Sequence, residues 1–248
     1  MDLREREQHG QRHPWEVARA RFFRRIVTDA VPGAPHRVID VGSGDSWFAA
    51  QLAPDLPAGS EIVCCDVHYT ADDLAAPLPA SMRRTAVPPL DTPGDLVLAL
   101  DVLEHIDDDR SFVRDELRPL VSDDGVLVVS VPAHQRLFTS HDIALGHFRR
   151  HDARTLRALL EPSFDIVREG SLFTTLLAPR ALSAAIERVR PPHGTPALDS
   201  VWTHGPVVSR TIAAVLSADA ATGRALANRR FRPPGLSVWA VCRPRAQS

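Results

Sequence analysis

The sequence predicts one α/β domain with a Rossmann-like, doubly wound sheet that is mostly parallel and has an antiparallel last strand. Short apolar runs alternate with helical segments from about residue 36, which is typical of a parallel sheet covered on both faces. A glycine-rich turn directly follows the first apolar run. The chain of 248 residues, with 44% hydrophobic and 24% charged residues, is long and apolar enough for one sizeable core.

The first expected element is a helix over residues 14–31, which we interpret as a helical lid within residues 1–35. Pro14 suits the first turn of a helix, and an apolar stripe follows it at helical spacing. Four arginines make this helix basic, so contact with acidic phospholipids is an alternative to the lid. Pro32 and Gly33 then end the helix.

The core is expected to span residues 36–174 and 231–248. Continuous apolar stretches predict its strands at 38–41, 62–67, 82–87, 96–100, 125–131, 164–167 and 236–241. Helical patterns lie at 47–52, 107–120 and 153–160, with a weaker one at 70–80. Residues 132–151 are predicted to form a long polar loop.

Residues 175–230 are predicted to be a helical insertion before the last strand. Two amphipathic helices over 175–189 and 206–221 flank a linker rich in proline and glycine. The apolar face of a surface helix must be buried against something. We therefore expect this pair of helices to cover a substrate pocket or to form a dimer contact, in a single-domain chain that is a monomer or a homodimer.

The composition argues against several classes of protein. A net charge of −2 gives no indication of a nucleic-acid partner, and the absence of lysine excludes Schiff-base chemistry. No stretch reaches the roughly 18 apolar residues of a membrane span. The start, Met1–Glu5, is charged and has no apolar signal core. The three cysteines lack metal or redox spacing, so we expect buried thiols and a cytoplasmic protein.

The turn after the first predicted strand decides the expected ligand. It runs Asp40-Val41-Gly42-Ser43-Gly44-Asp45-Ser46, and glycines there let the backbone approach a ligand closely. A dinucleotide fingerprint needs a third glycine where this chain has Trp47. The bulky tryptophan argues against a bound dinucleotide.

The turn resembles motif I of class I S-adenosylmethionine-dependent methyltransferases, with Ser46 replacing the third glycine. The segment Asp101–Ile106 resembles the Leu-Glu-His segment of that superfamily, and Asp66 lies where an acid accepts both ribose hydroxyls. The resemblance implies S-adenosylmethionine as cofactor. Its expected contacts are Arg19, Asp40, Gly42, Ser43, Gly44, Trp47, Asp66, Val67, Asp101 and Val102. An acid for the adenine amino group is not evident; Asp91 is a stand-in.

Three segments resemble a bacterial methyltransferase subfamily more narrowly: His13–Arg19, Ser140–Arg150 and Pro234–Ser237. The first implies that Trp15 and Arg19 lie over the site, with Arg19 paired to the methionine carboxylate. The second follows the fifth strand, so it starts beside the ligand crevice.

Histidine, aspartate and arginine gather in and around this second segment. Imidazoles are the usual general bases, so His141, Asp142 and His147 are the catalytic candidates, with His141 preferred. Substrate binding is assigned to Trp15, His134, Arg149 and Arg150. The spacing matches no standard metal signature, so no metal is expected.

The resulting hypothesis is methyl transfer from S-adenosylmethionine to a small-molecule or amphiphilic acceptor by in-line displacement. One alternative is a nicotinamide-dependent oxidoreductase, disfavoured because a Tyr-x-x-x-Lys pair is absent. The other is a non-catalytic accessory protein that binds S-adenosylmethionine. The accepting atom, O, N, C or S, is left open.

Overall fold

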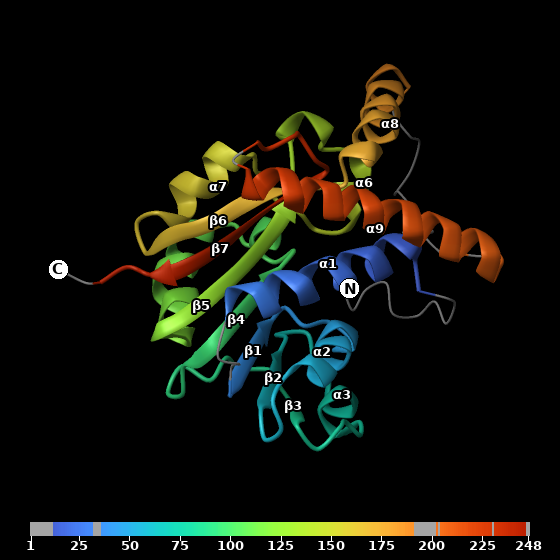
Figure 1. Ribbon diagram of the computed structural model, residues 1–248. Coiled ribbons are helices and arrows are strands. Elements are labelled where there is room, and N and C mark those ends of the chain that lie inside the picture. The colour runs from blue at the N-terminus through green and yellow to red at the C-terminus, as the bar shows by residue number, and fades with distance from the viewer. Residues whose placement is uncertain (1–11, 32–35, 191–201, 203, 230, 247–248) are drawn as a thin grey trace.

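A computed structural model describes residues 12–31, 36–190, 202, 204–229 and 231–246. Seven strands form one sheet in the order β3-β2-β1-β4-β5-β7-β6 (Figure 1). β1, β2, β3, β4 and β5 run parallel, and β7 is antiparallel to both of its neighbours. This confirms the predicted fold class. The strands are β1 (Arg37–Val41), β2 (Glu61–Cys65), β3 (Met82–Thr85), β4 (Gly94–Leu100), β5 (Val121–Pro132), β6 (Phe164–Leu172) and β7 (Ser237–Pro244).

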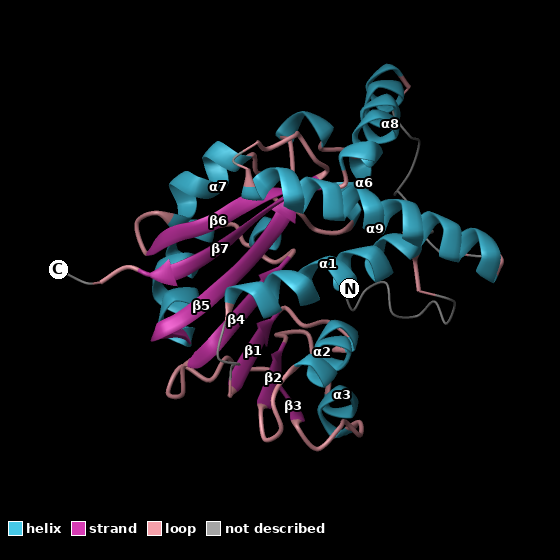
Figure 2. Cartoon of the chain, viewed as in Figure 1, coloured by secondary structure: helices cyan, strands magenta, loops and turns pink. Residues whose placement is uncertain are grey.

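Helices cover both faces of the sheet (Figure 2). The segment from Asp109 to Leu120 is one continuous helix with a π-helical middle. The helices are α1 (Pro14–Ala30), α2 (Trp47–Leu52), α3 (Ala71–Ala75), α4 (Asp109–Ser111), η4 (Phe112–Leu117), α5 (Arg118–Leu120), α6 (Ser140–Ala144), α7 (Ala153–Leu160), α8 (Leu177–Val189) and α9 (Pro206–Asn228). Short 3₁₀ turns are η2 (Ala53–Asp55), η3 (Leu103–His105), η5 (Gln135–Leu137) and η6 (Thr174–Leu176).

The core consists of two apolar layers, one on each face of the sheet. Neighbouring residues of a strand point to opposite faces, so Val38 joins the layer under α1 and α9 while Ile39 joins the layer under α5 and α7. Both side chains are fully buried. This double burial explains why the central strands are continuous apolar runs in the sequence.

The two insertion helices have different surroundings. α9 lies beside α1 across one face of the sheet and also contacts β6, and it extends beyond its predicted end (Figure 1). α8 contacts η5 and η6, and most of its apolar side chains are exposed. The large apolar side chains exposed on the two helices are Leu182, Ile186, Val189, Val207, Val208 and Val215. Part of the predicted apolar stripe is therefore uncovered in this chain.

The predicted loop at 132–151 contains two short helical elements, η5 and α6. Thr139 and Asp142 form a reciprocal capping box at the start of α6. The polar composition of this segment indicates a loop and gives no indication of the helix. Within the described residues, no helix has the length and apolar composition of a membrane span. Cys64, Cys65 and Cys242 are buried free thiols, and burial raises the pKa of each to about 12.

Candidate active site

A cavity of about 850 Å³ opens at the carboxyl ends of β1, β2 and β4. Its walls come from α1, from the turns that follow these strands, from the loop containing α6 and from the start of α8. In open α/β sheets ligands bind at this edge, because the strand order reverses there. Among the predicted site residues, the lining includes Trp15, Arg19, Gly42, Trp47, Asp66, Val67, Asp101, Val102, His141, Asp142, His147 and Arg150.

The turn after β1 needs glycine at one position for two reasons. Gly42 has φ +65°, and a Cβ atom built on it would lie 2.6 Å from Cγ2 of Val102. Gly44 also has positive φ, and its backbone N–H donates to Oδ2 of Asp66 at 3.0 Å. At Gly42 the backbone of this turn lines the cavity without a side chain, and the Asp66 carboxylate lies beside the turn.

Serine occupies the position of the third glycine without loss of the turn. Ser46 has φ +63°, a conformation that costs a non-glycine residue about 1–2 kcal/mol. Its buried hydroxyl lies 2.8 Å from the Tyr69 hydroxyl and accepts a bond from Arg84 Nε at 2.9 Å. These bonds offset the strain. Ser43 also turns inward, to Tyr69 and to the Cys65 carbonyl, so its hydroxyl does not face the cavity.

The two predicted cofactor-binding acids at the ends of β1 and β2 have opposite environments. Asp66 is half-buried on the cavity wall and accepts backbone N–H groups from Gly44 and His68, both at 3.0 Å. Asp40 is buried outside the cavity lining, and burial raises the pKa of its carboxyl to about 7. Asp66 therefore offers its carboxylate to the cavity, whereas Asp40 does not line it.

An ion pair joins the helical lid to the end of β4. The Arg19 guanidinium lies 2.8 Å from Oδ2 of Asp101 and donates to Ser130 Oγ at 3.1 Å. Ser130 in turn donates to Asp101 Oδ1 at 3.0 Å. Asp101 has φ +61°, which turns its carboxylate out of the strand direction. Among the described residues, the buried Nε of Arg19 has no hydrogen-bond partner.

The lid also contacts the turn after β1. The Arg12 guanidinium lies 4.7 Å from the centroid of the Trp47 ring and forms an ion pair with Asp45. It lies 3.6 Å from the Glu16 carboxylate as well. Trp15 lines the cavity from the same helix. Side chains from the start of the chain therefore form one wall of the site.

Asp142 is the centre of a buried charged network. Its carboxylate accepts from Arg150 Nε at 2.8 Å, from Arg180 at 2.8 Å and from the Thr139 backbone at 2.9 Å, and Nδ1 of His147 lies 3.1 Å away. Burial opposes the charged form, but the His147 bond and the Arg150 charge outweigh it and hold the pKa of Asp142 below its usual range. A fully buried, stably ionised carboxylate orients its neighbours and does not take up protons from a substrate.

His141 reaches the cavity from the first turn of α6 and is exposed. Partial burial and the charge of Arg180 lower the pKa of His141 below its ordinary value of 6.5. The imidazole is therefore neutral at pH 7 and able to accept a proton. Arg180 belongs to the insertion helix α8, and no pattern in the sequence pointed to its place beside Asp142.

Two predicted substrate-binding residues lie apart from the cavity. Arg149 donates to the Asp107 carbonyl at 2.6 Å and pairs with Asp109 at 3.0 Å, so it anchors the loop to the start of α4. His134 lies at a second, smaller cavity. Arg150 lines the main cavity, but its guanidinium group forms an ion pair with Asp142. Asp91, the stand-in for the adenine contact, is also outside the lining. From the segment after β3, the cavity is lined by Ala86 and Pro88 instead.

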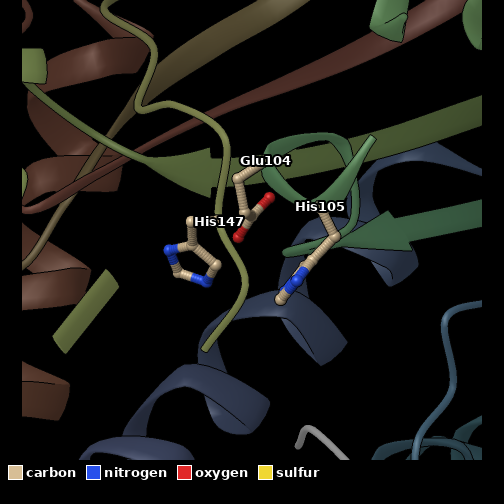
Figure 3. Close-up of side chains that lie close together, drawn as sticks. All are labelled: Glu104, His105 and His147. Carbon is tan, nitrogen blue, oxygen red and sulfur yellow. The ribbon is translucent and has the colours of Figure 1, made fainter. Parts of the chain in front are cut away.

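Glu104, His105 and His147 come together on the cavity wall (Figure 3). One ligand-type atom of each lies within 4.8 Å of the others, and the two imidazole rings are nearly perpendicular with centroids 4.6 Å apart. Glu104 is fully buried, and neither carboxylate oxygen has a hydrogen-bond partner among the described residues. Burial and the nearby Asp101 charge raise the pKa of Glu104 well above its ordinary value.

Comparisons with known proteins agree with this fold. A family model described as a methyltransferase domain matches residues 10–163. No curated protein matches the chain. Similar solved structures include the N-methyltransferase NodS from Bradyrhizobium japonicum WM9 in complex with S-adenosylhomocysteine, with a TM-score of 0.53 and 14% identity over 95% of this chain and 90% of that one.

Two further solved structures share the fold at low identity. Coclaurine N-methyltransferase bound to N-methylheliamine and S-adenosylhomocysteine has a TM-score of 0.54 and 8% identity, over 90% of this chain and 70% of that one. The [4+2]-cyclase SpnF has a TM-score of 0.52 and 16% identity, over 90% of this chain and 80% of that one. At such identities the likeness concerns the fold alone.

Proposed function

The chain belongs to the methyltransferase domain family, and from this premise we propose that it transfers a methyl group from S-adenosylmethionine to a small-molecule or amphiphilic acceptor. The observation that carries the proposal is the turn after β1. There Gly42 presents bare backbone to the cavity against Val102, and Asp66 stands beside it as a hydrogen-bond acceptor. The family assignment also favours methyl transfer over the nicotinamide alternative.

The residues fit the proposed cofactor. A Cβ on Gly42 would collide with Val102, so a side chain there would displace a residue of the cavity wall. Asp66 offers carboxylate oxygens to the two ribose hydroxyls, with Val67 and Val102 on the same wall. When bound, S-adenosylmethionine supplies an electrophilic methyl group on a sulfonium centre. The protein's contribution is chiefly alignment of the acceptor with that group.

The lid provides a binding site for the amino-acid end of the cofactor. Arg19 and Asp101 lie 2.8 Å apart and offer one cation and one anion on the cavity wall. A zwitterion presents the complementary pair, so its carboxylate binds Arg19 and its ammonium group binds Asp101. Trp15 and Trp47 close the same wall.

The acceptor side of the site is assigned to the loop after β5. For a hydroxyl acceptor, His141 takes the proton, because its imidazole is neutral and exposed at the cavity. Arg150 and Arg180 hold the loop in place through Asp142. The acceptor is bound between this loop, the start of α8 and the lid.

The test is calorimetric titration with S-adenosylhomocysteine. The wild-type chain should bind it, and Asp66→Ala should weaken binding roughly 10- to 100-fold, the equivalent of a lost hydrogen bond to a charged group. Asp124→Ala is the matched control, because Asp124 is exposed and lies outside the cavity lining. Equal affinity of Asp66→Ala and Asp124→Ala, or tighter binding of NAD than of S-adenosylhomocysteine, would contradict the proposal.

The same titration separates binding from catalysis at His141. His141→Ala should retain the affinity for S-adenosylhomocysteine and lose turnover of a hydroxyl acceptor. If turnover is also retained, His141 is not the base. If turnover is absent in a wild-type chain that binds the ligand, whatever acceptor is offered, the accessory-protein alternative gains support.

A further inference from the structure

We propose that Glu104, His105 and His147 bind one divalent transition-metal ion on the acceptor side of the cavity, although their spacing in the sequence matches no metal signature. The three side chains come from η3 and from the loop after α6, and Figure 3 shows the Glu104 carboxylate beside the two imidazole rings. All three residues line the cavity. An ion held by them would therefore be accessible to a substrate.

The strongest evidence is the environment of Glu104. A buried carboxylate is costly unless it is neutralised or hydrogen-bonded. Glu104 has zero exposure, and neither of its oxygens has a hydrogen-bond partner among the described residues. The nearby guanidinium groups do not donate to these oxygens, because Arg19 is bound to Asp101 and Arg150 to Asp142. A divalent cation would supply the missing partner.

The orientation of His147 provides independent evidence. Its Nδ1 lies 3.1 Å from Oδ1 of Asp142, and an ionised carboxylate only accepts hydrogen bonds. Nδ1 therefore carries a proton, and in the neutral imidazole Nε2 keeps a lone pair that can bind a ligand. Histidines that bind metals are held in this way by a carboxylate. Asp142 is itself fixed by Arg150 and Arg180 at 2.8 Å each, so the ring is rigidly placed.

The donor set selects the kind of ion. Two imidazoles and one carboxylate suit Zn²⁺, Fe²⁺, Mn²⁺ or Co²⁺, whereas Mg²⁺ and Ca²⁺ prefer oxygen ligands alone. Two ligand atoms of a tetrahedral site, each about 2.1 Å from the ion, lie about 3.4 Å apart. The three atoms here lie within 4.8 Å of one another, so binding requires the side chains to approach one another by up to about 1.4 Å. Three protein ligands leave positions open toward the cavity.

The role of the ion rests on the proposed function. An acceptor oxygen bound at an open position would be held beside the methyl group, and its proton would be more acidic on the ion. This predicts an acceptor with a hydroxyl or carboxylate oxygen near the methylated atom. Metal binding itself is measurable without any acceptor or methyl transfer.

The test is titration of the full chain, after treatment with a chelator, with Zn²⁺ in a calorimeter and with Co²⁺ followed by visible absorption. We expect one ion per chain, and Co²⁺ bands typical of nitrogen and oxygen ligands. Glu104→Gln keeps the shape of the side chain and should weaken Zn²⁺ binding at least 30-fold, as should His147→Ala. His36→Ala is the matched control, because His36 is exposed at the start of β1 and lies outside the cavity lining.

Binding of S-adenosylhomocysteine is measured for each variant in parallel. Retained affinity shows that the variant is folded and that the cofactor site is intact. Wild-type Zn²⁺ affinity in Glu104→Gln, or no Zn²⁺ bound by the wild-type chain, would overturn the metal site. A wild-type chain that binds Zn²⁺ but not S-adenosylhomocysteine would overturn the proposed function instead. If His147→Ala does not fold, the isosteric Glu104→Gln carries the comparison.

Discussion

Two residues in the turn after β1 have the same left-handed backbone but opposite reasons for their identity. Gly42 must lack a side chain because Val102 occupies the space, whereas Ser46 has a side chain that is needed for its bonds to Tyr69 and Arg84. The sequence pattern treated Ser46 as a departure from a family motif. In the fold it is a strained position that is stabilised locally, so the departure does not weaken the turn.

The first prediction separates backbone strain from the contact with Val102. Gly42→Ala places a Cβ 2.6 Å from Val102 Cγ2 and should reduce the affinity for S-adenosylhomocysteine at least tenfold in calorimetry. Gly59→Ala is the control, since Gly59 has φ +87° but nothing lies within 4 Å of its Cβ position. The control should lose only about 1 kcal/mol of stability and bind normally. Equal affinities in the two variants would show that the close contact is unimportant.

The second prediction concerns the buried Asp40. Its pKa is raised by burial from 3.8 to about 7, so the folded chain binds this proton more tightly than the unfolded chain. The resulting stabilisation is complete below pH 3.8 and is lost as the pH rises through 7. Between pH 5 and 8 the free energy of unfolding should fall by about 2–3 kcal/mol more in the wild type than in Asp40→Asn.

Urea unfolding at the two pH values, without ligand, measures this difference. Asp124→Asn serves as the control, because Asp124 is exposed and should leave the pH dependence as in the wild type. The same slope in the wild type and in Asp40→Asn would show that Asp40 is ionised in the folded chain throughout this range.

Among the secondary-structure elements, those that obey a local pattern were predictable. The central strands were found because they are buried on both faces, and α7 was found from its helical pattern; the structure adds a capping box of Asp152 and Thr155 at its start. The start of β5 was predicted too late, because Val121 pairs with Gly94 of β4 across a register shift. The end of β6 was predicted too early, because pairing with β7 continues to Leu172. Pairing between distant segments leaves no local signal.

The candidate site follows the same division. The turn after β1 and Asp66 were found from the sequence. In contrast, the cluster of Glu104, His105 and His147 and the contact between Asp142 and Arg180 each join segments that are distant in the sequence, so no sequence pattern indicated them. The guanidinium group of Arg149 could bind an anionic substrate, but it forms ion pairs with Asp107 and Asp109 instead. Residue type and spacing suggest a role for a side chain, but its contacts in the folded chain determine whether it is available for that role.

The third prediction tests whether α9 is part of the core. Leu216 is buried against the layer that contains α1, while its neighbour Val215 is 56% exposed. Leu216→Ala should lower the free energy of unfolding by about 2–4 kcal/mol through loss of apolar contacts. Val215→Ala removes a similar side chain from the exposed side and should change it by no more than about 0.5 kcal/mol. Equal effects in urea unfolding would place α9 outside the cooperative core.

The molecule as a whole is coupled through its cavity. One ligand site is enclosed by α1 near the start of the chain, by the ends of three strands, by the α6 loop and by α8 of the insertion. Contacts such as Arg19–Asp101 and Arg180–Asp142 hold these parts together across the site. A ligand that fills the cavity contacts all of them at once, so its binding should stabilise the whole fold and not one segment.

This coupling gives the last prediction, a rise in melting temperature with S-adenosylhomocysteine. A ligand that binds only the folded chain at 100 times its Kd adds about 2.7 kcal/mol to the free energy of unfolding. For a chain of this length each kcal/mol corresponds to about 2–4 °C, so Tm should rise by about 5–10 °C. Asp66→Ala should show a smaller rise at the same concentration, and Asp124→Ala should behave as the wild type. A single transition that shifts as a unit supports one cooperative fold around the cavity, whereas a separate transition unmoved by the ligand would show that part of the chain unfolds independently of the site.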